Sequence, residues 1–188
     1  GLVPDGPLAT LALGSKRTPM SVSVQYTLAE TKRSYPFWIF ALSLALLGLY
    51  VTAISFHAAS IFTTAGLPRD QGYLIFLHAA LVSILLRPLV GWLSDRVPLK
   101  FLLMAMLAGL VTSALGLCIL AEGPSRWIIV VGNGVCGAMM GTLSSVTWPN
   151  FYGRLHLGAI SGFNMAIVVF ASAFGPWLFS QSMAWTEG

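Results

Sequence analysis

The chain is 188 residues long, with 56% hydrophobic residues, 9% charged residues and a formal net charge of +4. Soluble domains carry roughly 25% charged residues, so this chain has too few charges to coat a globule in water. The composition therefore indicates a protein whose apolar surface faces lipid. The positive charge is spread along the chain, which excludes the dense basic patch that a nucleic-acid-binding protein needs.

Residues 1–35 form the first segment, which is more polar, more basic and richer in proline than the rest. The pair Lys32-Arg33 at its end is typical of a cytoplasmic loop that leads into a membrane helix. We expect a short helix at the membrane interface near residues 27–33. Because the chain begins with Gly1, we also expect it to be a fragment or a processed form.

Residues 36–188 contain five long apolar runs, each near the ~20 residues that an α-helix needs to cross a bilayer. Short breaks that carry charges or proline separate the runs. The pattern predicts an all-α, polytopic transmembrane helix bundle, with a sixth helix expected beyond the last residue. The predicted spans are residues 37–63, 72–94, 100–121, 127–149 and 158–181.

The placement of lysine and arginine predicts the orientation, because cytoplasmic loops carry an excess of both residues. If the first segment is cytoplasmic, seven of them fall on its side and two on the other, with Arg87 alone inside a span. The first group is Lys16, Arg17, Lys32, Arg33, Arg96, Lys100 and Arg154, and the second is Arg69 and Arg126. We therefore expect a plasma (inner) membrane protein with a cytoplasmic N-terminal segment.

The most specific motif follows the second predicted span and contains Gly91, Asp95, Arg96 and Lys100. Gly91 permits close helix contact, Asp95 can accept hydrogen bonds from a helix N-terminus, and the basic residues hold the loop in the cytoplasm. The stretch resembles the Gly-x-x-x-Asp-Arg loop of the major facilitator superfamily, which lies between helices 2 and 3 and again between helices 8 and 9. The family's second glycine is missing here, which favours the position between helices 8 and 9.

Other stretches resemble the same superfamily in the matching order. The opening Gly-Leu-Val-Pro-Asp-Gly is similar to the start of the central loop in bacterial monocarboxylate and oxalate/formate-type members, and residues 27–38 resemble the approach to their helix 7. Residues 152–162 and 173–176 resemble the loop between helices 10 and 11 and helix 11 itself. The resemblance implies a central loop plus helices 7–11 of a twelve-helix transporter, with the substrate site between its two halves.

Arg87 is the first candidate for substrate binding, because an arginine inside a membrane span is costly unless it faces protein or water. It precedes Asp95 by eight residues, or about 12 Å at 1.5 Å per residue. Its guanidinium can bind a carboxylate through two parallel hydrogen bonds. The resemblance assigns that role to an Arg-Pro-x-x-Gly pattern in helix 8, which Arg87 begins. The alternative is an arginine that snorkels or forms an ion pair.

Other residues complete the predicted substrate site. Ser83 shares a helix face with Arg87, while Tyr50 and His57 lie on one polar stripe at seven-residue spacing. His57 is a candidate proton carrier, or else it forms a hydrogen bond to a neighbouring helix. Asn133 either lines the cavity or forms a hydrogen bond between helices.

Two further features favour structural roles. His78 lies nine residues from Arg87, on the opposite face of a helix, so we expect a packing or headgroup role for it. Residues 132–137 match Gly-x-Gly-x-x-Gly, but they lie inside an apolar span without a preceding strand, which excludes dinucleotide binding. Gly134 and Gly137 indicate close contact with another helix instead.

The combined pattern predicts a secondary active transporter of a small organic anion that works by alternating access. A monocarboxylate is favoured, because the lysine that oxalate-type members carry in helix 11 is absent. The alternatives are an efflux transporter of drugs or amphiphiles and a non-transporting membrane sensor or scaffold. We expect no enzyme activity, metal or cofactor. The expected partners are the anionic substrate, membrane lipids and the missing N-terminal half of the transporter.

Overall fold

The computed structural model describes residues 25–120 and 125–186, with side chains up to residue 181, and every regular element in these residues is a helix. Five of the helices are long and apolar enough to cross a membrane, which confirms the predicted all-α bundle of five spans. The opening Gly-Leu-Val-Pro-Asp-Gly lies outside the described residues. The elements are α2 (Leu28–Thr31), α3 (Tyr35–Thr64), α4 (Arg69–Ser94), α5 (Leu99–Cys118), α6 (Ser125–Tyr152) and α7 (Leu157–Thr186).

Proline and glycine separate the first three long helices. Pro68 and Pro98 stand at the N-caps of α4 and α5, and a proline disfavours helical conformation in the residue before it. α3 ends at Thr64, and Gly66 follows with a φ of 75°, a conformation that favours a residue without Cβ. The Leu67 N–H then donates to the Phe62 carbonyl oxygen at 2.8 Å, which satisfies one of the last free carbonyls of the helix.

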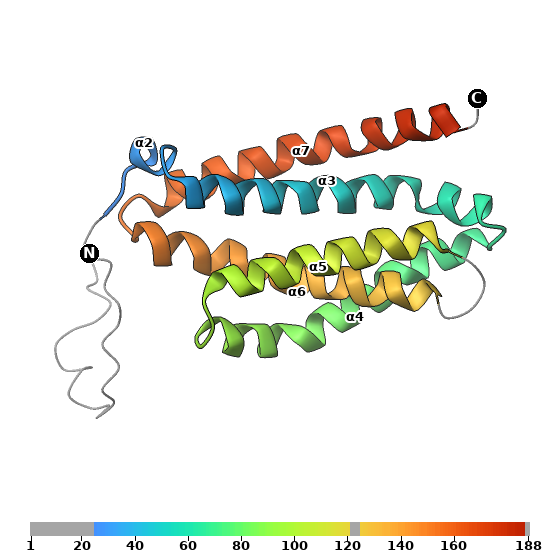
Figure 1. Ribbon diagram of the computed structural model, residues 1–188, viewed down its shortest axis with the longest axis horizontal. Coiled ribbons are helices and arrows are strands. Elements are labelled where there is room, and N and C mark those ends of the chain that lie inside the picture. The colour runs from blue at the N-terminus through green and yellow to red at the C-terminus, as the bar shows by residue number, and fades with distance from the viewer. Residues whose placement is uncertain (1–24, 121–124, 187–188) are drawn as a thin grey trace.

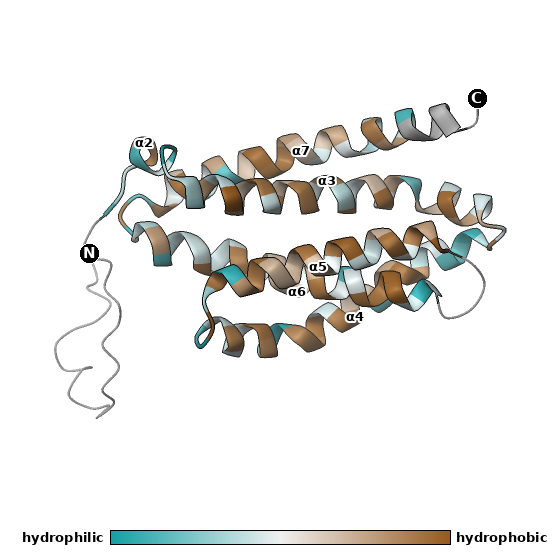
Figure 2. Ribbon diagram, in the orientation of Figure 1, coloured by the Kyte–Doolittle hydropathy of each residue, from teal (hydrophilic) through white to brown (hydrophobic). Residues whose placement is uncertain are grey.

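The five long helices form two groups (Figure 1). α3 and α7 lie side by side, and α6 contacts both α4 and α5. α3 also contacts α4, α5 and α6, so it connects the two groups, whereas α6 and α7 touch little although they follow each other in the chain. Figure 2 shows apolar residues along most of each long helix and polar residues concentrated near the helix ends.

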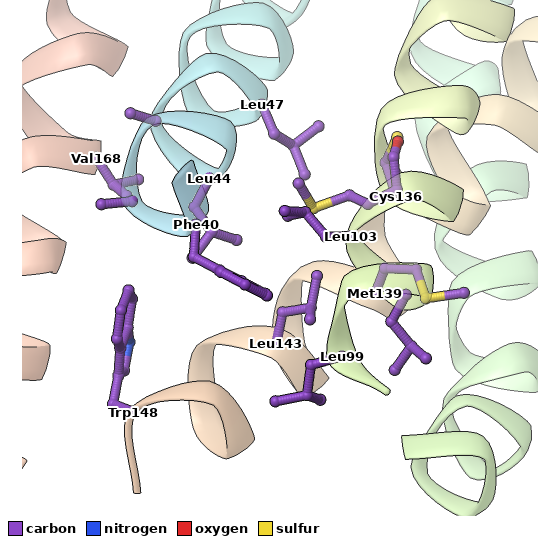
Figure 3. Close-up of a cluster of buried hydrophobic side chains, with 14 of the residues drawn as sticks. Phe40, Leu44, Leu47, Leu99, Leu103, Cys136, Met139, Leu143, Trp148 and Val168 are labelled. Carbon is purple, nitrogen blue, oxygen red and sulfur yellow. The ribbon is translucent and has the colours of Figure 1, made fainter. Parts of the chain in front are cut away.

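The apolar core lies where the two groups meet (Figure 3). Phe40, Leu44 and Leu47 of α3 extend toward Leu103 of α5 and Leu143 of α6, and all five side chains are buried. Outside this core, large apolar side chains face outward. Leucine and phenylalanine side chains on such a surface are as apolar as the lipid tails around them. Burying them between helices therefore gains little from exclusion of water, and close van der Waals contact holds the helices together.

Glycines allow close contact among α4, α5 and α6. A Cβ on Gly132 would lie 2.7 Å from the Gly109 carbonyl oxygen of α5. A Cβ on Gly134 would collide with Val82 of α4, and one on Gly137 would lie 2.9 Å from Ser83 Oγ. The glycine-rich residues 132–137 therefore serve close helix contact on two sides of α6.

A short segment, residues 25–34, joins the start of α3 to the turn between α6 and α7. We call it the N-terminal strap. Its Gln25 side chain accepts hydrogen bonds from the backbone N–H groups of Arg154 at 2.9 Å and Leu155 at 3.0 Å. Gly153, with a φ of 80°, leaves the space that the Gln25 amide occupies. The expected short helix corresponds to α2, which lies inside this strap.

Candidate functional site

α4 and α6 diverge toward the end of the molecule that carries the N-terminal strap (Figure 1). A cleft of about 560 Å³ lies between these helix ends. The two helices touch at Ser83 and Gly137 and move apart beyond that contact. The cleft is lined by Arg87, Gly91, Ser94 and Asp95 of α4 and by Gly141, Thr142, Ser145 and Val146 of α6. Polar and small residues thus gather where the two helix ends face each other.

Arg87 is the cationic residue of the cleft. Its side chain is exposed, and within the described part of the chain no group forms a hydrogen bond or ion pair with its guanidinium. Asp95, the acidic residue of the lining, stands eight residues further along α4, or about 12 Å along the helix axis. The guanidinium therefore keeps all five N–H donors available to a ligand.

Thr142 and Ser145 supply hydroxyl groups from the opposite wall. Ser145 Oγ donates to the Gly141 carbonyl oxygen at 3.1 Å, and Thr142 Oγ1 donates to the Ala138 carbonyl oxygen at 3.3 Å. Because both hydroxyl protons are engaged with the α6 backbone, their lone pairs remain as acceptors toward the cleft. Neither residue was predicted from the sequence. Their spacing from Gly141, one and four positions, was the available signal, since it places all three on one helix face.

Ser83 and Asn133 lie beside this cleft rather than in its lining. Ser83 is 7% exposed and faces Gly137 at the contact between α4 and α6. Asn133 precedes Gly137 by one helical turn, and its Nδ2 is buried without a hydrogen-bonding partner among the described residues. Both residues thus lie at the α4–α6 contact that bounds the cleft.

Tyr50 and His57 contact other helices and do not join Arg87. The Tyr50 hydroxyl donates to Ser113 Oγ of α5 at 2.7 Å. His57 Nε2 lies 3.2 Å from the Pro176 carbonyl oxygen of α7, and its ring centroid lies 4.9 Å from that of Phe179. These contacts correspond to hydrogen bonds between neighbouring helices, the alternative that the sequence left open for His57.

The loop motif is divided between the cleft and the surface. Gly91 and Asp95 belong to the cleft lining. Arg96 places its guanidinium carbon 4.2 Å from the ring centroid of Trp92, a cation–π contact of the kind common for arginine. Lys100 lies 5.2 Å from the ring of Phe101 in the same way. Both basic side chains are exposed beyond the end of α4.

Five helices that are long and apolar enough to cross a membrane define an integral membrane protein, with a polar cleft between two of them. Residues 4–176 match the family model of the Major Facilitator Superfamily, and the chain belongs to this superfamily. The match confirms the superfamily that the motif at residues 91–100 indicated. Comparisons with curated proteins and with solved structures give no match.

Proposed function

We propose that this protein is a secondary active transporter of a small organic anion, and that a monocarboxylate is the preferred class. The proposal rests on Arg87, a residue within a membrane-spanning helix. Its guanidinium faces the cleft between α4 and α6 and has no hydrogen-bonding or ion-pair partner among the described residues. An unpaired charge at that depth is costly. A carboxylate would offset the cost through two parallel, charge-assisted hydrogen bonds.

The remaining cleft residues support the same class of substrate. Thr142 and Ser145 line the cleft together with Arg87, and their hydroxyl oxygens are free to accept a hydrogen bond from a ligand. Such acceptors suit a hydroxyl group or an acidic proton on a small anion. Gly91 follows Arg87 by one turn and carries no side chain that would fill the space beside the guanidinium.

Transport would proceed by rocking of two halves about a central site, with this chain supplying helices of the C-terminal half and a second half supplying the facing wall. Asp95 and Arg96 would latch the side from which the N-terminal strap projects. On this proposal that side is the cytoplasm and the membrane is the plasma (inner) membrane, in keeping with the excess of lysine and arginine there.

The test is uptake of radiolabelled lactate and acetate by cells that produce the full-length protein with Arg87→Ala or Arg87→Lys. We expect Arg87→Ala to lower uptake by about tenfold or more, because a charge-assisted hydrogen bond contributes about 1.5–3 kcal/mol. Lysine retains the charge but cannot bind the carboxylate bidentately, so we expect an intermediate loss. Arg69→Ala, an exposed arginine in the first turn of the same helix, is the matched control.

Undiminished uptake by Arg87→Ala, at equal amounts of protein in the membrane, would sink the assignment of Arg87. If the protein instead transports cationic amphiphiles and does so equally well without Arg87, the efflux alternative replaces the anion transporter.

A further inference from the structure

A second cavity lies between α4 and α6 near the ends at which these helices begin. Its volume is about 140 Å³. His78 belongs to it and precedes Arg87 by nine residues, or about 14 Å along α4. The contact of Ser83 with Gly137 separates this cavity from the Arg87 cleft. The lining consists of Gln71, Leu74, Ile75 and His78 of α4 and Arg126, Trp127 and Val130 of α6.

Arg126 is held in place at one wall of this cavity. Its Nη1 donates to Gln71 Oε1 at 3.2 Å, so the two side chains connect the first turns of α6 and α4. A guanidinium has five N–H donors, and this bond uses one of them. Gln71, with its oxygen engaged, keeps its two amide N–H donors. The polar groups of this wall therefore present donors to the cavity.

The hydrogen bond of His78 determines where its ring gains a proton. Nδ1 lies 2.7 Å from the Leu74 carbonyl oxygen, and a carbonyl oxygen can only accept, so Nδ1 carries a hydrogen. The neutral ring consequently has a lone pair at Nε2, and protonation converts that nitrogen into a donor. The ring also packs edge-on against Trp127, with 5.3 Å between centroids, which restricts its orientation.

We propose that this cavity binds a small anionic group, a carboxylate or a phosphate, together with one proton on Nε2 of His78. An anion between the Arg126 guanidinium and the protonated imidazole would accept a hydrogen bond from each. The proton is taken from a hydronium ion or a buffer acid: its bond to the donor breaks as the Nε2–H bond forms, the conjugate base stays in the aqueous phase, and no other bond changes.

The residues around His78 leave Arg126 as the charged partner for an anion that binds together with the proton. Among the described residues, Arg126 is the charged group that lines the cavity, and α4 adds the uncharged Gln71. α3 contacts this end of α4 through the apolar Ala58 and Phe62, which approach Gly72. No carboxylate of the lining competes for the guanidinium. The site is separate from the Arg87 cleft, so the inference goes beyond the proposed transport function and does not require it.

The experiment measures proton uptake by the full chain in nanodiscs of neutral phosphatidylcholine when acetate is added near pH 7. Arg87→Ala is the background, because it removes the other candidate carboxylate site. We expect up to one proton bound per acetate, and an acetate affinity that weakens by up to about tenfold for each unit of rising pH, because one proton binds with the anion.

Substitutions in this background identify the groups. His78→Asn keeps an amide N–H for the Leu74 carbonyl oxygen but cannot titrate, so we expect proton uptake to disappear while the helix contact remains. Arg126→Gln should weaken acetate binding by about tenfold or more. His156→Asn, an exposed histidine in the turn after α6, should change neither quantity.

Discs that contain phosphatidylglycerol distinguish the source of the anion. Loss of acetate binding in those discs, dependent on Arg126, means that a lipid phosphate occupies the cavity, whereas unchanged binding means that the ligand is a soluble anion. Acetate binding without His78-dependent proton uptake overturns the proposal. So does an absence of binding together with no effect of phosphatidylglycerol. Either result leaves the role of Arg87 untouched, because Arg87 is absent from these proteins.

Discussion

Two helix pairs of this protein meet in different ways, and the difference explains where its chemistry lies. α3 and α7 run alongside each other, with aromatic contacts at both ends: Phe37 stacks on Phe163 and His57 packs on Phe179. α4 and α6 instead touch closely at Gly134 and Gly137 and leave a cavity on each side of that contact. Both pairs are in extensive contact, but the cavities beside α4 and α6 contain Arg87 and Arg126, whereas the cavity that α3 and α7 line together with α5 is almost wholly apolar.

The charged residues follow this geometry. Arg87 and Arg126, on the two sides of the α4–α6 contact, both line cavities. Between α3 and α7, in contrast, a polar side chain bonds to the neighbouring helix: His57 contacts the Pro176 carbonyl oxygen. Mutations that change one pair and spare the other therefore test whether the α3–α7 pair provides rigidity and the α4–α6 pair provides binding.

The largest effect on stability is expected for Gly175→Ala in the α3–α7 pair. The new Cβ would collide with the Leu49 carbonyl oxygen, and backbone cannot rotate away as a side chain can. Overpacking of this kind costs about 1–3 kcal/mol. Thermal or denaturant unfolding of the purified protein in detergent measures the loss. Gly162→Ala, on the same helix with no atom within 4 Å, is the control and should not destabilise.

A loss of about 1–2 kcal/mol is expected for Gly134→Ala in the α4–α6 pair. The new Cβ would collide with Cγ1 and Cβ of Val82, and a change of rotamer cannot move the Val82 Cβ, so the helices have to shift. Because α4 and α6 would be pushed apart, both acetate binding at the His78 cavity and anion uptake should change as well. If stability falls while both binding readouts stay at the wild-type level, the contact does not shape the cavities. Gly141→Ala, where the Cβ meets open space, is the stability control.

The N-terminal strap connects the two pairs, since the Tyr152 hydroxyl at the end of α6 donates to Ser34 Oγ before α3 at 3.0 Å. Gly153→Ala would force a left-handed backbone onto a residue with Cβ and collide with Gln25. We expect a loss of roughly 1–2 kcal/mol and faster proteolysis within residues 25–34. Gly158→Ala, in open space within the first turn of α7, should leave the cleavage rate unchanged.

Tyr50→Phe removes a single hydrogen bond between α3 and α5. Hydrogen bonds between membrane helices contribute about 0.6 kcal/mol on average, so we expect a destabilisation of that size in the same unfolding assay. Anion uptake should persist, because Tyr50 lies away from the Arg87 cleft. Loss of uptake at normal stability would restore Tyr50 to the substrate site.

The smallest effect concerns pH and the strap. Hydrogen bonds from the Thr27 backbone N–H and hydroxyl, with nearby positive charge, hold the pKa of Glu30 below its ordinary value of 4.5. The carboxylate therefore stabilises α2 fully above pH 4.5, and this contribution is lost as the pH falls through the lowered pKa. A carboxyl NMR titration should show the lowered pKa, and Thr27→Ala should return it toward 4.5.

Much of the architecture was predictable because a membrane imposes it on each helix separately. Backbone groups in lipid must be satisfied within one segment, so the apolar runs predicted the five long helices, and charges and prolines marked their separation. Arg87 was identifiable for the same reason, since its position relative to Asp95 gives its depth directly. The loop at residues 91–100 indicated the superfamily that the family match confirmed.

Only the tertiary structure decided which faces meet. Tyr50 and His57 share a stripe on α3, yet one contacts α5 and the other α7, because α3 lies between those helices. Thr142 and Ser145 were not predicted, because their hydroxyls donate to the backbone of their own helix. Such a residue can face lipid, protein or a cleft, and the sequence does not distinguish these positions. In a membrane protein the lipid-facing and the buried faces of a helix are both apolar. The sequence therefore determines how long each helix is and how deep a residue lies in the membrane, whereas the packing of the helices determines which neighbour each side chain faces.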